Sequence, residues 1–133
     1  MARKTAREVA MKLIYEERMG GEGRSQTIDG LMDVSLDADD HIYIQDIVEG
    51  VSTREAEMDA LIEKHLVDWS MERVSRVDAS ILRLAVYEIL YREDIPAAVS
   101  INEAVEMAHT YSTPEAAALI NGVLGGIVRS PNT

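Results

Sequence analysis

Few residues of this sequence are spaced as a reaction or a metal site would need them. Glu106 and His109 form a Glu-x-x-His pair, which is half of the ligand set of the two-metal carboxylate site that some helix bundles carry. The other half needs a second such pair and two further glutamates on facing helices. The two remaining histidines, His41 and His65, belong to no such pair. A metal site is therefore the minor alternative, and a surface position for His109 is favoured.

Other patterns that carry chemistry are missing or incomplete. The run Asp37-Ala38-Asp39-Asp40 resembles the start of a calcium loop, but it lacks the glycine and the closing glutamate that such a loop requires. It fits the start of a helix better, with Asp37 or Asp39 as the N-cap. The sequence has no cysteine, no glycine-rich phosphate loop and no Gly-x-Ser-x-Gly motif. We therefore expect a protein that binds rather than catalyses, with no cofactor and no metal.

Three basic side chains near the start could bind a polyanion. Arg3 and Arg7 lie one helical turn apart and so share a face, with Lys4 beside them. The chain of 133 residues has a net charge of −11, but residues 1–24 carry +2 and the remainder −13. The acidic remainder of the chain would repel nucleic acid, so nucleic acid would bind at the first helix. From charge alone, however, a solvated helix start is the favoured interpretation.

The hydrophobic spacing that must position these residues is helical throughout. Apolar residues recur at three- and four-residue intervals within residues 6–13, 43–51, 58–66 and 116–127. Residues 74–91 are apolar on nearly all sides, which is typical of a helix in the middle of a bundle. A short helix around Gln26–Met32 is a weaker prediction, and Trp69 is expected in a turn. No strand alternation competes, so the sequence predicts an all-α bundle of about six or seven helices.

Several signals mark where these helices begin and end. Ser100-Ile101-Asn102-Glu103 matches a capping box, and Thr113-Pro114-Glu115 offers a capping threonine, a proline at the first helical position and an acid in the first turn. The glycines at 20, 21 and 23 should end the first helix, and Gly50 should interrupt the end of the helix over 43–51. Ile95-Pro96 should break the helix over residues 74–91, because proline lacks the amide donor and clashes with the preceding turn.

The apolar segment 74–91 also contains three charged residues, Asp78, Arg83 and Glu88. One interpretation places them on a narrow exposed strip, with Glu88 and Arg92 paired one turn apart. The other gives Asp78, at the start of the helix, to a partner protein. The residues alone leave both interpretations open, because a buried charge is tolerated only when it is paired.

Length and composition set the remaining expectations. The chain fits a single domain over residues 1–133, with a core of aliphatic residues, since it has one Trp and no Phe. The charged N-terminus lacks the apolar run of a signal peptide, and no stretch is long enough for a transmembrane helix. The absence of cysteine fits a reducing cytoplasm.

Four stretches, in order, resemble the NusB transcription antitermination family. The longest, residues 73–88, reads RVSRVDASILRLAVYE, and the others are Ala6-Arg7-Glu8 leading to Tyr15, Pro96 through residues 101–108 (INEAVEMA), and residues 120–124 (INGVL). Together they span nearly the whole chain. The resemblance implies two small helical subdomains that bind boxA-type RNA of ribosomal RNA transcripts with the ribosomal protein NusE. That assembly lets RNA polymerase read through terminators.

The resemblance also assigns roles to individual residues. Arg3, Lys4 and Arg7 correspond to the family's arginine-rich start and would contact the RNA, since arginine offers a planar fork of donors. Glu115, Leu119 and Asn121 match positions that border the RNA, whereas Tyr15 and Asp78 match positions that face the protein partner.

The sequence departs from the family pattern in the last helix. A lysine and an aromatic residue commonly precede the Asn-Gly pair, but Ala118 and Leu119 stand here, and Gly125-Gly126 replace a usual Asp-Lys pair. These changes remove a phosphate contact and a stacking surface. The partner protein should therefore supply much of the affinity of the complex for RNA. The alternative is a helical interaction or homodimerisation scaffold with weak or no RNA binding.

Overall fold

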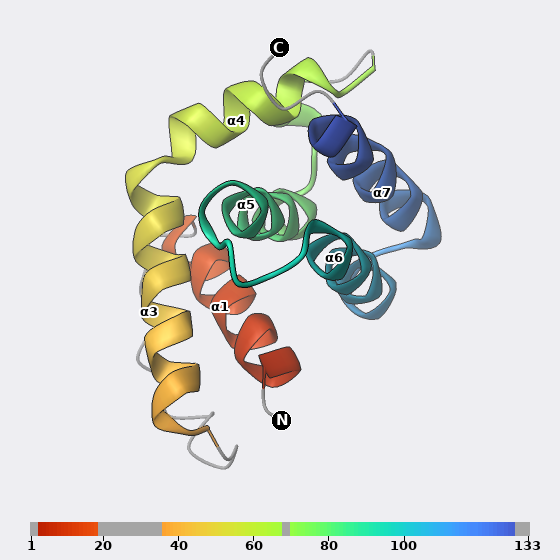
Figure 1. Ribbon diagram of the computed structural model, residues 1–133. Helices are drawn as coiled ribbons and strands as arrows, with labels where there is room; N and C mark the ends of the chain where they lie inside the picture. The colour runs from red at the N-terminus through yellow and green to blue at the C-terminus, as the bar shows by residue number, and fades with distance from the viewer. Residues whose placement is uncertain (1–2, 19–35, 68–69, 130–133) are drawn as a thin grey trace.

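The structure is a computed structural model that describes residues 3–18, 36–67 and 70–129. These residues form six α-helices and one short 3-10 helix, η2 (Figure 1). The helices are α1 (Arg3–Arg18), α3 (Ala38–Thr53), α4 (Glu55–Lys64), η2 (Met71–Arg73), α5 (Arg76–Tyr91), α6 (Ala97–Tyr111) and α7 (Pro114–Arg129). Within these ranges there is no strand, and the prediction of an all-α bundle of about six or seven helices is confirmed.

Helix α5 forms the centre of the bundle. It packs against each of the other five α-helices, and every residue from Asp78 to Glu88 is buried. In Figure 1, α1 and α3 lie on one side of α5, α6 and α7 on the other, and α4 passes above α5 at the top of the view. The sequence prediction of a buried central helix is therefore confirmed.

The outer helices bury the apolar stripes that their spacing predicts. In α1 the buried residues include Ala6, Val9, Ala10 and Leu13, and in α7 they include Ile120 and Ile127. Burying one such isoleucine or leucine contributes about 1.5–3 kcal/mol to folding. These stripes fix which face of α1 and α7 remains available at the surface.

Side chains cap three helices at their N-termini. Asp37 caps α3, because its Oδ1 accepts from the Asp40 amide at 2.8 Å and Asp40 accepts in return from the Asp37 amide at 3.1 Å. Thr113 caps α7, with its Oγ1 accepting from the Ala116 amide at 3.0 Å, as predicted. Ser75 caps α5 through the Asp78 amide at 3.1 Å. Of the two candidates for the first cap, the structure therefore selects Asp37.

Two predicted helix boundaries are wrong. Helix α6 begins at Ala97, directly after Pro96, so Ser100 lies inside the helix and caps nothing. Its hydroxyl instead donates to Glu88 Oε1 at 2.7 Å. Gly50 does not interrupt α3 either, because the helix runs on to Thr53. A Cβ at residue 50 would lie 2.1 Å from the Tyr87 ring, so this glycine allows α3 to approach α5.

The exposed strip proposed for the charges of α5 does not exist. Asp78, Arg83 and Glu88 are all buried. Arg83 donates two hydrogen bonds to Asp59 of α4, at 2.8 Å and 3.0 Å. Arg92 pairs with Asp46 and Asp94 rather than with the Glu88 carboxylate. The charges of Asp78, Arg83 and Glu88 therefore lie inside the bundle.

Three predictions fall outside the described residues: the end of the first helix at the glycines of residues 20–23, the short helix around Gln26–Met32, and the turn at Trp69. Among the described helices, none is long and apolar enough to cross a bilayer.

Candidate nucleic-acid interface

The three predicted cations of α1 do not share one environment. Arg3 is half-buried, Lys4 is exposed and Arg7 is only 3% exposed. Arg3 and Arg7 share a helix face, as predicted, because both guanidinium groups lie over the ring of Tyr43, with Cζ 4.5 Å and 5.8 Å from its centroid. Only Arg3 and Lys4 can therefore offer charge to a ligand at the surface.

Arg7 belongs to a buried network around the Glu88 carboxylate. Glu88 has no exposed surface and accepts from Arg7 Nε at 2.9 Å, from the Tyr43 hydroxyl, and from the Ser100 hydroxyl. These four side chains come from α1, α3, α5 and α6. The network satisfies a buried charge that would otherwise be very costly, and it holds the first half of α1 against the core.

The contacts of this network shift the pKa values of Arg7 and Tyr43. Burial opposes the charged form of Arg7, but the nearby Tyr43 and Glu88 raise the pKa of the guanidinium. Burial, and next the Glu88 carboxylate, raise the pKa of the Tyr43 phenol, which stays protonated and donates. Glu103 of α6 adds a longer contact to Arg7, at 3.5 Å from Nη1. Arg7 is thus fully engaged within the protein.

Lys4 also has a partner, on the surface. Its Nζ lies 2.5 Å from Glu106 Oε2, and the two side chains are 60% and 58% exposed. The hydrogen bond between them raises the pKa of Lys4 and lowers the pKa of Glu106. Glu106 therefore pairs with a cation, and among the described residues no group of three or more His, Cys, Asp or Glu could hold a metal ion. His109 is exposed, as the favoured interpretation predicted.

Arg92, just after α5, is a further cation of this region that the sequence analysis did not assign to the interface. Its guanidinium lies 5.4 Å from the centroid of the Tyr43 ring. It donates to Asp94 at 2.8 Å and to Asp46 at 3.0 Å. These contacts, that to Asp94 first, raise the pKa of Arg92. Its grouping with Arg3 could not be predicted, because the aromatic ring between them belongs to α3.

The predicted residues of α7 lie apart from the α1 cations. Glu115 and Asn121 are exposed, and Leu119 is half-buried. Helix α6 lies between α1 and α7 in Figure 1, and Lys4 and Arg3 contact Glu106 of α6 and Tyr43 of α3 instead. An interface that uses all of them must therefore extend over α1, α6 and α7.

The two predicted partner residues lie on helices that pack together, α1 and α5. Tyr15 is half-buried near the end of α1. Asp78 is 7% exposed in the first turn of α5, and its Oδ1 is buried with no hydrogen-bond partner among the described residues. A buried acceptor without a donor is costly, so Asp78 is not used to stabilise the described part of the fold.

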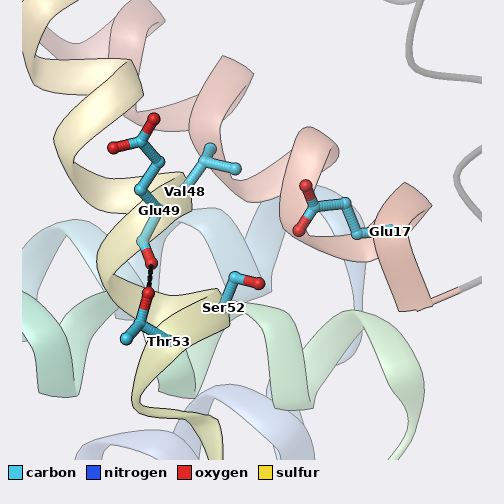
Figure 2. Close-up of a pocket in the computed structure, with 5 residues that line it drawn as sticks. All are labelled: Glu17, Val48, Glu49, Ser52 and Thr53. Atoms are coloured by element: carbon cyan, nitrogen blue, oxygen red, sulfur yellow. Dashed lines mark hydrogen bonds between the residues drawn. The ribbon is translucent and has the colours of Figure 1, made fainter.

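A pocket of about 290 Å³ lies between α1 and α3, and none of the predicted site residues lines it. Figure 2 shows that Glu17 comes from α1, whereas Val48, Glu49, Ser52 and Thr53 come from α3. The Thr53 hydroxyl donates to the Glu49 carbonyl at 2.7 Å. The carboxylates of Glu17 and Glu49 would repel a phosphate, so this pocket does not suit nucleic acid.

Comparisons with known proteins agree with this arrangement. A family model described as the NusB family matches residues 4–129. The chain belongs to the NusB family. Its relatives include a transcription antitermination protein NusB of Acetivibrio thermocellus, 45% identical over 130 residues, which cover 97% of this chain and 90% of that protein. Another, of Clostridium novyi, is 39% identical and covers 98% and 100%.

Solved NusB structures share the fold. A structure of T. maritima NusB matches with a TM-score of 0.85 and 32% identity, over 97% of this chain and 92% of that one. A structure of the antitermination factors NusB and NusE in complex with dsRNA matches with a TM-score of 0.82 and 25% identity, over 96% of each chain. The expected fold family is therefore confirmed.

Proposed function

We propose that this protein is a transcription antitermination factor that binds boxA-type RNA of ribosomal RNA transcripts together with the ribosomal protein NusE. The observation that carries the proposal is the NusB family match over residues 4–129. It is supported by the likeness to a NusB–NusE–dsRNA structure over nearly the whole chain. The assembly would act on RNA polymerase in the cytoplasm and promote read-through. The protein contributes binding and no catalysis.

The RNA surface in this proposal begins at Arg3 and Lys4 and extends to α7. The exposure of these two side chains supports it, because Arg3 is half-buried and Lys4 is exposed, so both can offer charge to an RNA phosphate. Glu115, Leu119 and Asn121 form the second part, where Asn121 can hydrogen-bond a base edge or a sugar. We assign Arg7 to positioning, because the buried bond to Glu88 uses its charge to hold α1 in place.

The NusE surface in this proposal consists of Tyr15 and Asp78. The packing of α1 against α5 supports it, because it joins the helices that carry these two residues. A partner donor that reached the Asp78 carboxylate would form a charge-assisted bond worth about 1.5–3 kcal/mol.

A salt-dependence experiment tests the RNA surface. Each phosphate contact with single-stranded RNA contributes about 0.7 to the slope of log affinity against log salt. The double variant Arg3→Ala, Lys4→Ala should therefore bind boxA-type RNA more weakly and lower the slope by about 1.4. Lys64→Ala, which removes an exposed cation of α4, is the matched control and should change little. Equal slopes for the double variant and wild type would remove Arg3 and Lys4 from the RNA surface.

One observation favours a second candidate function, a protein-interaction or homodimerisation scaffold. The chain's own side chains already engage all three predicted cations, through Tyr43, Glu106 and Glu88. Analytical ultracentrifugation with and without RNA separates the two candidates, because the scaffold would sediment as a dimer that RNA does not alter.

A further inference from the structure

The exposed ion pair between Lys4 and Glu106 is placed where the RNA surface begins. Lys4 lies in the first turn of α1, and Glu106 reaches it from the middle of α6, with 2.5 Å between Nζ and Oε2. Both side chains are more than half exposed. A solvated pair of this kind contributes little to the stability of a fold. A role in holding α1 and α6 together therefore does not explain this ion pair.

Helix α6 directs two carboxylates toward the cations of α1. Glu103 and Glu106 are three residues apart and so lie on one face of the helix. Glu103 reaches the buried Arg7 at 3.5 Å, and Glu106 reaches the exposed Lys4. Glu103 also acts on Lys4, whose pKa is raised mainly by Glu106 and further by Glu103. The acidic face of α6 is therefore matched to the basic face of α1.

We propose that Glu106 sets the RNA affinity of this protein by competing with an RNA phosphate for Lys4. This inference rests on the proposed function. A phosphate that approaches the Lys4 ammonium meets the Glu106 carboxylate, whose Oε2 lies 2.5 Å from Nζ, so the two anions compete for one positive charge. If the carboxylate stays nearby, it repels the phosphate that replaces it. RNA therefore binds weakly until other contacts offset the loss of the ion pair.

The competition gives the protein partner a defined role. Contacts between NusE and the RNA would raise the affinity of the complex for RNA without a change in the charge of this chain. RNA that meets the isolated protein encounters a neutralised Lys4, whereas RNA held by both proteins can displace Glu106. The acidic residue would thus suppress binding to RNA that no partner holds.

A double-mutant cycle tests the proposal. We compare wild type, Glu106→Gln, Lys4→Gln and the double variant in titrations with boxA-type RNA at one low salt concentration. Glu106→Gln should bind about fivefold more tightly, the factor that corresponds to the upper range of an exposed ion pair. In the Lys4→Gln background the same substitution should give a clearly smaller gain. Glu49→Gln, an exposed acid of α3 lining the pocket in Figure 2, controls for the change in net charge.

The outcomes separate this inference from the proposed function. If wild type binds RNA but Glu106→Gln binds no more tightly than Glu49→Gln, the competition is overturned and the RNA function stands. An equal gain with and without Lys4 also overturns it, because the effect would then be general electrostatics. If none of the proteins binds RNA, with or without NusE, both proposals fail. Thermal melting should differ little between wild type and Glu106→Gln, which confirms that the fold is intact.

Discussion

At the scale of single residues, the buried carboxylate of Glu88 determines what the N-terminus can do. Its three donors, from Arg7, Tyr43 and Ser100, come from three other helices. Glu88 is unusual in the sequence, because it is a charge in an apolar helix. Its partner Arg7 is 81 residues away and so could not be found from the sequence. Charge and resemblance therefore predicted that Arg7 contacts RNA.

Removing one donor from this network should be costly. In Tyr43→Phe the buried carboxylate loses the phenol hydrogen bond, and a buried group left short of a partner costs about 1–3 kcal/mol. Urea unfolding should therefore show a fall in the free energy of unfolding of that size. Tyr91→Phe is the control, because the Tyr91 hydroxyl bonds Glu57 at the surface and its loss should stay within about 0.5 kcal/mol. Similar losses for both variants would show that the network contributes little.

The same tyrosine makes stability sensitive to alkaline pH. Burial and the Glu88 carboxylate raise the pKa of Tyr43 in the folded protein above its ordinary value of 10.0. In the unfolded chain the phenol ionises at its ordinary pKa, so its contribution is complete below about pH 10 and is lost as pH rises further. The free energy of unfolding should fall as pH rises above about 10, and less steeply in Tyr43→Phe. Parallel curves for the two proteins would contradict this assignment.

At the scale of helices, local pattern predicted most of the elements but not every boundary. The Thr113-Pro114-Glu115 signal is right because Thr113 bonds an amide of its own first turn. The Ser100 signal is wrong because the same kind of hydroxyl bonds a residue of α5. A local motif cannot distinguish these two outcomes, since the competing partner is brought in only by tertiary packing.

Two glycines of α7 provide a matched test of what surrounds this helix. A Cβ added at Gly122 would have no atom within 4 Å, whereas one at Gly126 would lie 2.6 Å from the His65 ring. Gly122→Ala should therefore stabilise the protein by up to about 1 kcal/mol, the difference in helix propensity. Gly126→Ala should gain nothing or destabilise it, because the imidazole must move. Thermal melts check this, and equal shifts for both variants would contradict the packing of His65 on α7.

At the scale of the whole molecule, net charge and family resemblance give opposite indications about RNA binding. The net charge of −11 argues against nucleic acid, and the exposed cation Lys4 is neutralised by Glu106. Family membership argues for RNA. Both fit a protein that binds RNA weakly alone and more tightly beside a partner. The residues of this shared surface could be proposed from motifs, but their pairing with acids of α6 depended on the fold.

The measurement that tests this account most directly is a titration of boxA-type RNA with the protein alone and with NusE present. We expect NusE to tighten RNA binding by roughly fivefold to 150-fold, the usual range of coupling between two sites. Asp78→Asn should reduce this gain, because it weakens the acceptor that the partner would use, while RNA binding by the isolated protein stays as in wild type. Identical RNA affinity with and without NusE, or no RNA binding in either case, would contradict the account.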